Sequence, residues 1–404
     1  MIILHVNVVY PVGSTGKIVN DIVSCMGVEH SIVCYGRGKN ITQNRVVKFC
    51  TELEAKVQGL RNRLGGLQYG GNYFATKRLK NLILNEKPDI VHLHCINGYC
   101  VNLYQLLDFL AKNNFKTVIT HHAEFYYTGS CGHALDCNKW TLEEGCGNCP
   151  QKRGATGCLF KDNTSLAWDL LKRSFAKFKK SNLRFVAVSP WVKDRSMLSP
   201  IVNQFACDVV MNGLNTNIFK WKKDGTKFQQ ISDNEIVCLH VTASFETKRN
   251  TLKGGQYIIE LARLNPTYKF IVASMHTDVT EELPANIILW GRTKDQEELA
   301  RLYRRANITI ITSKRETFSM IVAESLCCGT PIVGFEAGGP ESITIPEYSR
   351  FVEQGNINAF QEAMVEILNK KLDSSEISKS GHSKYSKEIM VSNYLNLYKD
   401  LLDS

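Results

Sequence analysis

Residues 308–335 constrain the fold more than any other part of the chain. Residues 308–312 form a short run of mostly β-branched side chains, which is typical of a strand buried in a parallel sheet. A helix is predicted from near Thr317 to the breaker at residues 329–331, and a second strand follows over residues 331–335. Two strands joined by a helix form a βαβ unit, so we predict an α/β fold.

Two glutamates in this stretch suggest a ligand site. Glu316 precedes the predicted helix, and Glu324 lies about two turns along it. The backbone amides at the helix start are those of Thr317, Phe318 and Ser319, and such amides favour an anion like a diphosphate. Glu324 would then accept hydrogen bonds from sugar or ribose hydroxyls. The alternative is structural, with Glu316 as a first-turn acid and Glu324 as an exposed helical residue.

Strands and helices alternate through two series, which indicates two domains. The chain has 404 residues, more than one domain usually holds. The first series starts with a strand at residues 1–8, and the second starts at residue 236. Residues 220–233 show little periodicity and are predicted to be the linker.

Positive charge is concentrated in the first half of the chain. Residues 1–210 contain 26 Lys and Arg against 15 Asp and Glu, whereas residues 211–404 contain 23 against 24. The first half is therefore predicted to face an anionic partner, either nucleic acid or an acidic membrane surface. No signal-peptide pattern and no run of about 20 apolar residues occur. We expect a cytoplasmic protein that can lie peripherally at the inner face of the plasma membrane.

A basic amphipathic helix is predicted within this half. Its apolar residues recur at helical spacing, and lysines and an arginine occupy much of the remainder. The apolar residues are Leu166, Leu170, Leu171, Phe175 and Phe178. This pattern has two equally favoured interpretations. The helix can lie on an anionic bilayer, or it can pack its apolar stripe in the domain core.

Four cysteines, Cys131, Cys137, Cys146 and Cys149, have the spacing C-x5-C-x8-C-x2-C. In a reducing compartment this spacing favours a structural zinc site, in which four thiolates leave no open position for water. His133 or Cys158 could substitute for one ligand. Two disulfides or four unrelated thiols remain the alternatives.

Other candidate residues follow strands of the first domain. Gly13, Ser14, Thr15 and Gly16 come after the first strand, where open α/β sheets place a phosphate or substrate loop, although a plain tight turn explains the glycines as well. His122 closes the strand at residues 117–120. Ligands gather at the carboxyl ends of such strands, which raises the interest of His122 together with His94 and Asn97.

Taken together, these motifs resemble family 4 (group 1) glycosyltransferases of the GT-B fold, of the bacterial surface-polysaccharide type with a cysteine-rich insert. They occur in family order. The motifs are residues 13–16, 88–94, 120–122 with 128–129, the four cysteines with Trp140, residues 210–213, Lys253-Gly254, and Glu316 to Glu324. The resemblance implies two Rossmann-like domains facing across a cleft. They would be an acceptor-side domain over residues 1–212, with the insert at 129–158 and a returning C-terminal helix at 385–404, and a nucleotide-sugar domain over 213–384.

The resemblance also implies roles by position. Glu316 would lie by the donor sugar and Glu324 on the ribose, with the amides of residues 317–319 on the diphosphate. Lys253 would neutralise that diphosphate, and the glycines of residues 13–16 would close over it. His122 would lie near the transferred sugar, but Ala123 stands where the family usually has an aspartate.

A further departure concerns the second diphosphate cation. The family has Gly-Arg a few residues before Lys-Gly, whereas this chain has residues 242–249 and a longer gap, so Arg249 or Lys248 is our hypothesis for this cation. The chain contains no Asp-x-Asp, and no divalent ion is expected for the chemistry. The family implies retention of anomeric configuration and a nucleotide-diphosphate sugar donor. The charge bias suggests a saccharide acceptor carried on a lipid diphosphate.

Two other functions fit parts of the sequence. A nucleotide-sugar epimerase or a phosphorylase would use the same scaffold, although no lysine is singled out for a pyridoxal cofactor. A basic nucleic-acid-binding protein would use the cysteine cluster and the N-terminal charge, but it would leave the nearly neutral second domain unexplained.

Overall fold

The computed structural model describes residues 1–223, 228, 231–232 and 234–404, and it divides them into two compact units. Unit 1 comprises Met1–Met211 with Met390–Ser404, and unit 2 comprises Asn212–Ile389. Half of the predicted linker at residues 220–233 lies outside the described residues.

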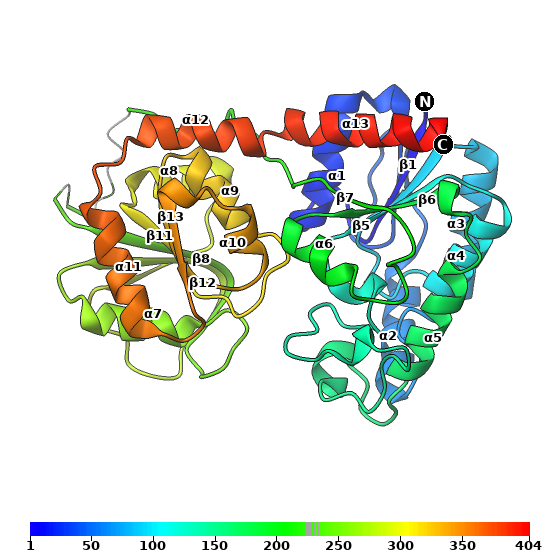
Figure 1. Cartoon of the computed structure of the whole chain (residues 1–404), viewed down its shortest axis with the longest axis horizontal. Coiled ribbons are helices and arrows are strands. Elements are labelled where there is room, and N and C mark those ends of the chain that lie inside the picture. The colour runs from blue at the N-terminus through cyan, green and yellow to red at the C-terminus, as the bar shows by residue number, and fades with distance from the viewer. Residues whose placement is uncertain (224–227, 229–230, 233) are drawn as a thin grey trace. The chain divides into compact units, whose positions relative to one another are not determined.

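Unit 1 is built on a seven-stranded parallel sheet in the order β3-β2-β1-β4-β5-β6-β7 (Figure 1). The strands are β1 (Ile3–Asn7), β2 (Ser31–Tyr35), β3 (Val46–Lys48), β4 (Ile90–Leu93), β5 (Thr117–His121), β6 (Leu183–Ala187) and β7 (Cys207–Val209). The helices are α1 (Gly13–Met26), α2 (Glu52–Leu64), α3 (Tyr73–Glu86), α4 (Leu103–Lys112), α5 (Thr164–Phe175) and α6 (Pro190–Ser196). The central strands are fully buried, as expected when helices cover both faces.

Unit 2 repeats the same plan with six parallel strands in the order β10-β9-β8-β11-β12-β13. The strands are β8 (Val237–Glu246), β9 (Lys269–Asp278), β10 (Ile287–Gly291), β11 (Ile308–Ile311), β12 (Ile332–Phe335) and β13 (Ser349–Val352). The helices are α7 (Gly255–Leu264), α8 (Gln296–Arg305), α9 (Met320–Cys327), α10 (Gly339–Ile343), α11 (Ile357–Asn369) and α12 (Ser374–Tyr385). The predicted doubly wound α/β fold is confirmed in both units.

The C-terminal helix α13 (Lys387–Asp403) returns to unit 1, as expected (Figure 1). Its apolar side chains, among them Met390 and Leu401, join a core cluster with Ile3, Ile90 and Val118. Buried hydrogen bonds add to this apolar contact. The Tyr398 hydroxyl lies 2.6 Å from Nδ1 of His92, and the Tyr394 hydroxyl lies 3.1 Å from the Thr120 hydroxyl.

The basic helix α5 belongs to the core of unit 1. Trp168, Leu171 and Phe175 are buried and Leu166 is 50% exposed, so most of the apolar stripe packs in the core. Cations on the helix and just after it contact this protein's own acids. Lys172 of α5 pairs with Glu143, and Lys177, beyond the end of the helix, pairs with Asp108, at 2.7 and 2.6 Å. This helix therefore does not supply a free basic face.

The cysteine-rich insert is tied to the sheet by a fully buried carboxylate, Glu124, directly beyond β5. Glu124 accepts a hydrogen bond from the amide of Ala134, at 2.5 Å, and forms an ion pair with Arg195 of α6. The Arg195 guanidinium also donates to the Leu135 carbonyl and lies 5.0 Å from the centre of the Trp140 ring. The buried pair thus joins β5, α6 and the insert.

Replacing Glu124 by alanine should destabilise unit 1 by about 3 kcal/mol, because Arg195, whose side chain is 14% exposed, would remain charged without its carboxylate partner. Glu143→Ala removes an exposed ion pair and should cost less than about 1 kcal/mol. Urea unfolding of both variants measures the difference. Equal losses would mean that Glu124 does not anchor the insert.

Candidate functional site

The strand order of unit 2 reverses between β8 and β11, so the loops after these neighbouring strands diverge to opposite faces of the sheet. Open α/β sheets bind ligands at this position, beyond the carboxyl ends of the strands. The two loops are joined here by hydrogen bonds. The amide of Lys314 donates to the Leu252 carbonyl at 2.8 Å, and the Thr312 hydroxyl donates to the Lys253 carbonyl at 2.9 Å.

Lys253 and Glu316 meet at this point. The Lys253 ammonium donates to Oε1 of Glu316 at 2.6 Å, with both side chains partly exposed. Gly254, with φ of +65°, permits the approach, since a Cβ atom there would lie 2.2 Å from the Thr312 carbonyl oxygen. The structure therefore brings together two residues that the sequence had placed in one site.

The start of α9 differs from the prediction. The helix begins at Met320, so Thr317 and Phe318 lie in the preceding loop and Ser319 is the N-cap residue, with φ of +81°. The Ser319 hydroxyl is buried and has no hydrogen-bond partner among the described residues. A buried polar group of this kind is expected to gain a partner when a ligand binds.

A second loop holds the residues before α9 in place. The Glu316 amide donates to the Ala337 carbonyl at 3.0 Å, and the Gly339 amide donates to the Glu316 carbonyl at 2.9 Å. The nearby α10 offers no comparable anion site, because the carboxylate of Glu341 already accepts from the amides of Ala337 and Gly338. Of these two helix starts, α9 is the one suited to an anion.

Glu324 lies on α9, and a buried tyrosine orients its carboxylate. The Tyr303 hydroxyl donates to Oε2 of Glu324 at 3.0 Å. Burial, together with the charge of Glu324, holds the pKa of Tyr303 well above its usual value. The sequence did not reveal Tyr303, because an aromatic residue on the apolar side of α8 looks like any core residue.

The loop after β8 carries the two candidates for a second cation. Residues 244–246 at the end of β8 pair with β9, so the first part of the gap before Lys253 is strand and residues 247–252 form the loop. Lys248 forms an ion pair with Asp278 at 3.0 Å, and Arg249 is exposed. This arrangement favours Arg249.

In unit 1 the strand order reverses between β1 and β4, and Asn7 at the end of β1 connects the loops there. Its side chain donates to the Thr15 hydroxyl at 3.2 Å and accepts from the amide of Cys95 at 3.0 Å. Gly13, Ser14, Thr15 and Gly16 form the first turn of α1 and not a separate loop. Gly16 is required, because a Cβ atom there would lie 2.9 Å from the Val9 carbonyl oxygen.

His122, which is partly buried, ends a chain of histidines whose other members, His5 and His94, are buried. His5 carried no sequence signal for this chain. Nδ1 of His5 lies 3.1 Å from Nε2 of His94, and Nδ1 of His94 lies 3.3 Å from Nε2 of His122. Burial lowers the pKa of His5 to about 3 and that of His122 to about 4. These imidazoles are therefore neutral at pH 7, and His122 can donate or accept hydrogen bonds but carries no charge.

His5, His92 and His94 are close enough together to be considered as metal ligands. Their nitrogens are largely engaged, however. His92 contacts the hydroxyls of Thr120 and Tyr398, and His94 uses both nitrogens on His5 and His122. We interpret the three residues as a hydrogen-bonded core network.

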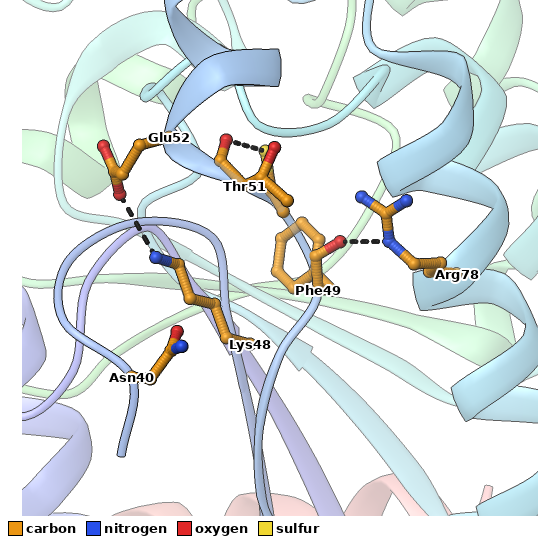
Figure 2. A pocket seen from close by; sticks show the side chains of 7 residues that line it. Asn40, Lys48, Phe49, Thr51, Glu52 and Arg78 are labelled. Atoms are coloured by element: carbon orange, nitrogen blue, oxygen red, sulfur yellow. Dashed lines mark hydrogen bonds and ion pairs between the residues drawn. The ribbon is translucent and has the colours of Figure 1, made fainter.

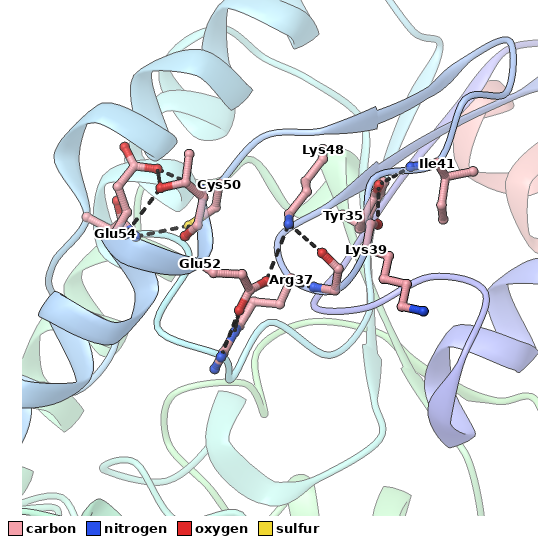
Figure 3. A network of polar contacts seen from close by, with 11 residues as sticks. Tyr35, Arg37, Lys39, Ile41, Lys48, Cys50, Glu52 and Glu54 are labelled. Carbon is pink, nitrogen blue, oxygen red and sulfur yellow. Dashed lines mark hydrogen bonds and ion pairs between the residues drawn. The ribbon is translucent and has the colours of Figure 1, made fainter.

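A small pocket beyond β3 in unit 1 is lined by Lys48, Glu52 and Arg78 (Figure 2). Glu52 pairs with Arg37 and Lys48 (Figure 3), and Arg78 pairs with Glu54. The Gly38 amide, with Arg37 and Lys48, lowers the pKa of Glu52 to about 2. The cations here are balanced by carboxylates, so this pocket does not explain the positive bias of the N-terminal half.

Comparison with known proteins identifies the domain that contains these residues. Residues 253–384, which contain Lys253, Glu316 and Glu324, match the family described as glycosyl transferases group 1. The chain is 20% identical over 386 residues to the putative colanic acid biosynthesis glycosyl transferase WcaC of Escherichia coli, covering 92% of each chain. The protein is a glycosyltransferase with a group 1 domain over residues 253–384.

Solved structures agree on the fold of this glycosyltransferase. Sucrose-phosphate synthase from Thermosynechococcus elongatus superimposes with a TM-score of 0.69 at 14% identity, covering 99% of each chain. Anabaena HepE in complex with UDP superimposes with a TM-score of 0.66 at 14% identity, and the match covers 99% of this chain and 100% of the HepE chain. The two doubly wound sheets are those of the GT-B fold. The described helices of the glycosyltransferase include none with the length and apolar character of a membrane-spanning segment.

The histidine cluster gives unit 1 a pH-dependent stability. Burial lowers the pKa values of His5, His92, His94, His121 and His122. Below about pH 6.5 the unfolded chain binds protons that the folded unit does not, so stability falls with pH by about 1.4 kcal/mol per unit for each histidine. Stability should be full above pH 6.5 and fall as the pH drops toward 4.

Urea unfolding between pH 7.5 and 5.5 tests this. In a Trp221→Phe/Trp290→Phe variant the remaining tryptophans, Trp140, Trp168 and Trp191, all lie in unit 1 and report on it alone. A midpoint independent of pH would contradict the prediction.

Proposed function

We propose that this glycosyltransferase transfers a sugar from a nucleotide-diphosphate sugar to a saccharide acceptor in bacterial polysaccharide biosynthesis. The observation that carries the proposal is the meeting of Lys253 and Glu316 beside the start of α9, at the point where the strand order of unit 2 reverses. The name of the Escherichia coli relative supports the polysaccharide pathway. The HepE structure, which holds UDP, supports a nucleotide-bound donor.

The proposed chemistry requires stabilisation of a leaving diphosphate. When the bond between the anomeric carbon and the diphosphate oxygen breaks, positive charge develops on the sugar and negative charge on the diphosphate. Lys253, with Arg249 as second cation, would stabilise the diphosphate together with Ser319 and the amides before α9. No divalent ion is then needed. Glu316 would contact the sugar and Glu324 the ribose.

The acceptor hydroxyl would attack from the face that the diphosphate leaves, with retention of configuration. Its oxygen forms the new bond to the anomeric carbon, and its proton passes to the leaving diphosphate, so no protein nucleophile is required. The neutral His122 would hydrogen-bond near the transferred sugar. The acceptor would be carried on a lipid diphosphate, consistent with the positive N-terminal half.

Lys253→Met should lower kcat/KM by on the order of 100-fold, because a charge on the leaving group would be left unbalanced. Lys222→Met is the matched control, since Lys222 forms a similar pair with Glu297, at 2.8 Å, elsewhere in unit 2.

Glu316→Gln should abolish transfer yet tighten UDP binding, because Lys253 would lose the carboxylate that competes with the diphosphate for its ammonium group. Turnover and calorimetry with UDP measure both effects. Full turnover in Lys253→Met or Glu316→Gln would refute the site.

We also propose that Cys131, Cys137, Cys146 and Cys149 bind a structural zinc ion. Cys149 raises the pKa of the Cys131 thiol, and Cys146 and Cys137 act on it in the same direction, which indicates that the four cysteines lie near one another. The amide of Gly129 donates to the Cys146 sulfur at 3.2 Å, a contact that suits a thiolate ligand. Among the described residues no three of these sulfurs lie mutually within 4.8 Å, so binding would draw them together.

Elemental analysis should find about one zinc per chain in the purified protein. Cys149→Ser should lose it, while Cys25→Ser, at an exposed cysteine outside the insert, should retain it. Loss of zinc in Cys158→Ser would mean that Cys158 is a ligand in place of one of the four proposed cysteines. A zinc-free protein with fewer than 14 titratable thiols after denaturation would indicate disulfides instead.

A further inference from the structure

Helix α2 in unit 1 is inverted relative to a normal surface helix. Its buried positions are Ala55, Gln58 and Asn62, which are small or polar. Its large apolar residues, Leu53, Val57, Leu60 and Leu64, are between 44% and 71% exposed. A helix at the surface of a globular protein normally turns its apolar stripe toward the core.

Polar contacts on the inner face fix this orientation. The Asn62 amide donates to the Thr156 carbonyl at 2.7 Å. The side chain of Gln58 fills the space over Gly71, where a Cβ atom would lie 1.8 Å from it. Rotating the helix to bury its leucines would break these contacts, so the outward stripe is a stable feature of the fold.

A neighbouring segment extends the stripe. The Leu159 amide donates to the Arg63 carbonyl at 3.0 Å, which places Leu159 and Phe160 beside the end of α2. Both side chains are exposed, Phe160 to 68%. We call Leu53, Val57, Leu60, Leu64, Leu159 and Phe160 the α2 patch. Exposed apolar groups gathered in this way usually mark an interaction surface.

Cations flank the patch. At about 100° per residue, the α2 stripe spans an arc of about 60°, with Lys56 and Arg63 on one side and Arg61 on the other. All three are exposed and form no ion pair within the described part of the chain. The acids at the start of the helix are already paired, Glu52 with Arg37 (Figure 3) and Glu54 with Arg78.

We propose that the α2 patch docks on an anionic lipid bilayer, with α2 lying in the plane of the interface. An apolar stripe flanked by lysine and arginine matches both layers of such a surface, the acyl region and the charged headgroups. Two copies of this basic surface would repel each other, which argues against a self-interface. The inference does not require the proposed reaction, but a bilayer at this surface would bring unit 1 to a lipid-linked acceptor.

Vesicle co-sedimentation of the full chain, without donor or acceptor, tests the proposal. The vesicles are phosphatidylcholine alone or mixed with phosphatidylglycerol. Leu60→Gln/Leu64→Gln should weaken binding to the mixed vesicles about tenfold or more. Leu198→Gln/Leu264→Gln is the control, because these leucines are equally exposed, at 60% and 54%, outside the patch. Arg61→Gln/Arg63→Gln should lower the affinity for the mixed vesicles roughly fivefold for each charge removed. The same variant should lose the preference for anionic lipid.

Each outcome bears on the proposal. Selective loss in the patch variants, with unfolding temperatures equal to that of the wild type, would support it. Failure of the wild type to bind mixed vesicles, or equal binding by the patch and control variants, would overturn it. A dimer that dissociates in the Leu60→Gln/Leu64→Gln variant would identify a self-interface and would also overturn it. Vesicle binding by a protein that transfers no sugar would contradict the proposed function alone.

Discussion

The reversal of strand order in each sheet determines where chemistry can occur. Parallel strands need helices on both faces, and the order changes direction only between β1 and β4 and between β8 and β11. At these two positions the loops that follow the neighbouring strands diverge to opposite faces of the sheet, so no helix covers the strand ends between them. Lys253 and Glu316 occupy one position, and Asn7 with the first turn of α1 occupies the other. The candidate residues are positioned by sheet topology before any of their own contacts form.

Much of this organisation could be predicted from the sequence, because it depends on local pattern. The β-branched run at residues 308–312 and the breaker at 329–331 define a βαβ unit without tertiary information. The motifs assign Lys253 and Glu316 to one site, and the structure places their side chains in contact. The start of α9 was misplaced because the backbone of Ser319, at φ of +81°, delays the helix by three residues, and no residue type there indicates this.

Features that depend on distant contacts could not be predicted. Tyr303 orients Glu324 from another helix, and the histidine chain joins three strands, so neither leaves a periodic signal. The orientation of the two basic helices also depends on distant contacts and could not be predicted. Helices α5 and α2 both carry an apolar stripe with cations, yet α5 buries its stripe and α2 exposes it. The difference lies in what packs against Gln58 and Asn62, which the sequence of the helix does not contain.

The return of α13 to unit 1 has a consequence for how the chain folds during synthesis. Unit 2 is continuous from Asn212 to Ile389, whereas unit 1 requires Met390–Ser404 to complete its core. Until those residues leave the ribosome, His92 and Thr120 lack their tyrosine partners and the adjoining apolar surface stays open. The unit that begins first is therefore finished last, and it depends on protection from aggregation throughout translation of the other.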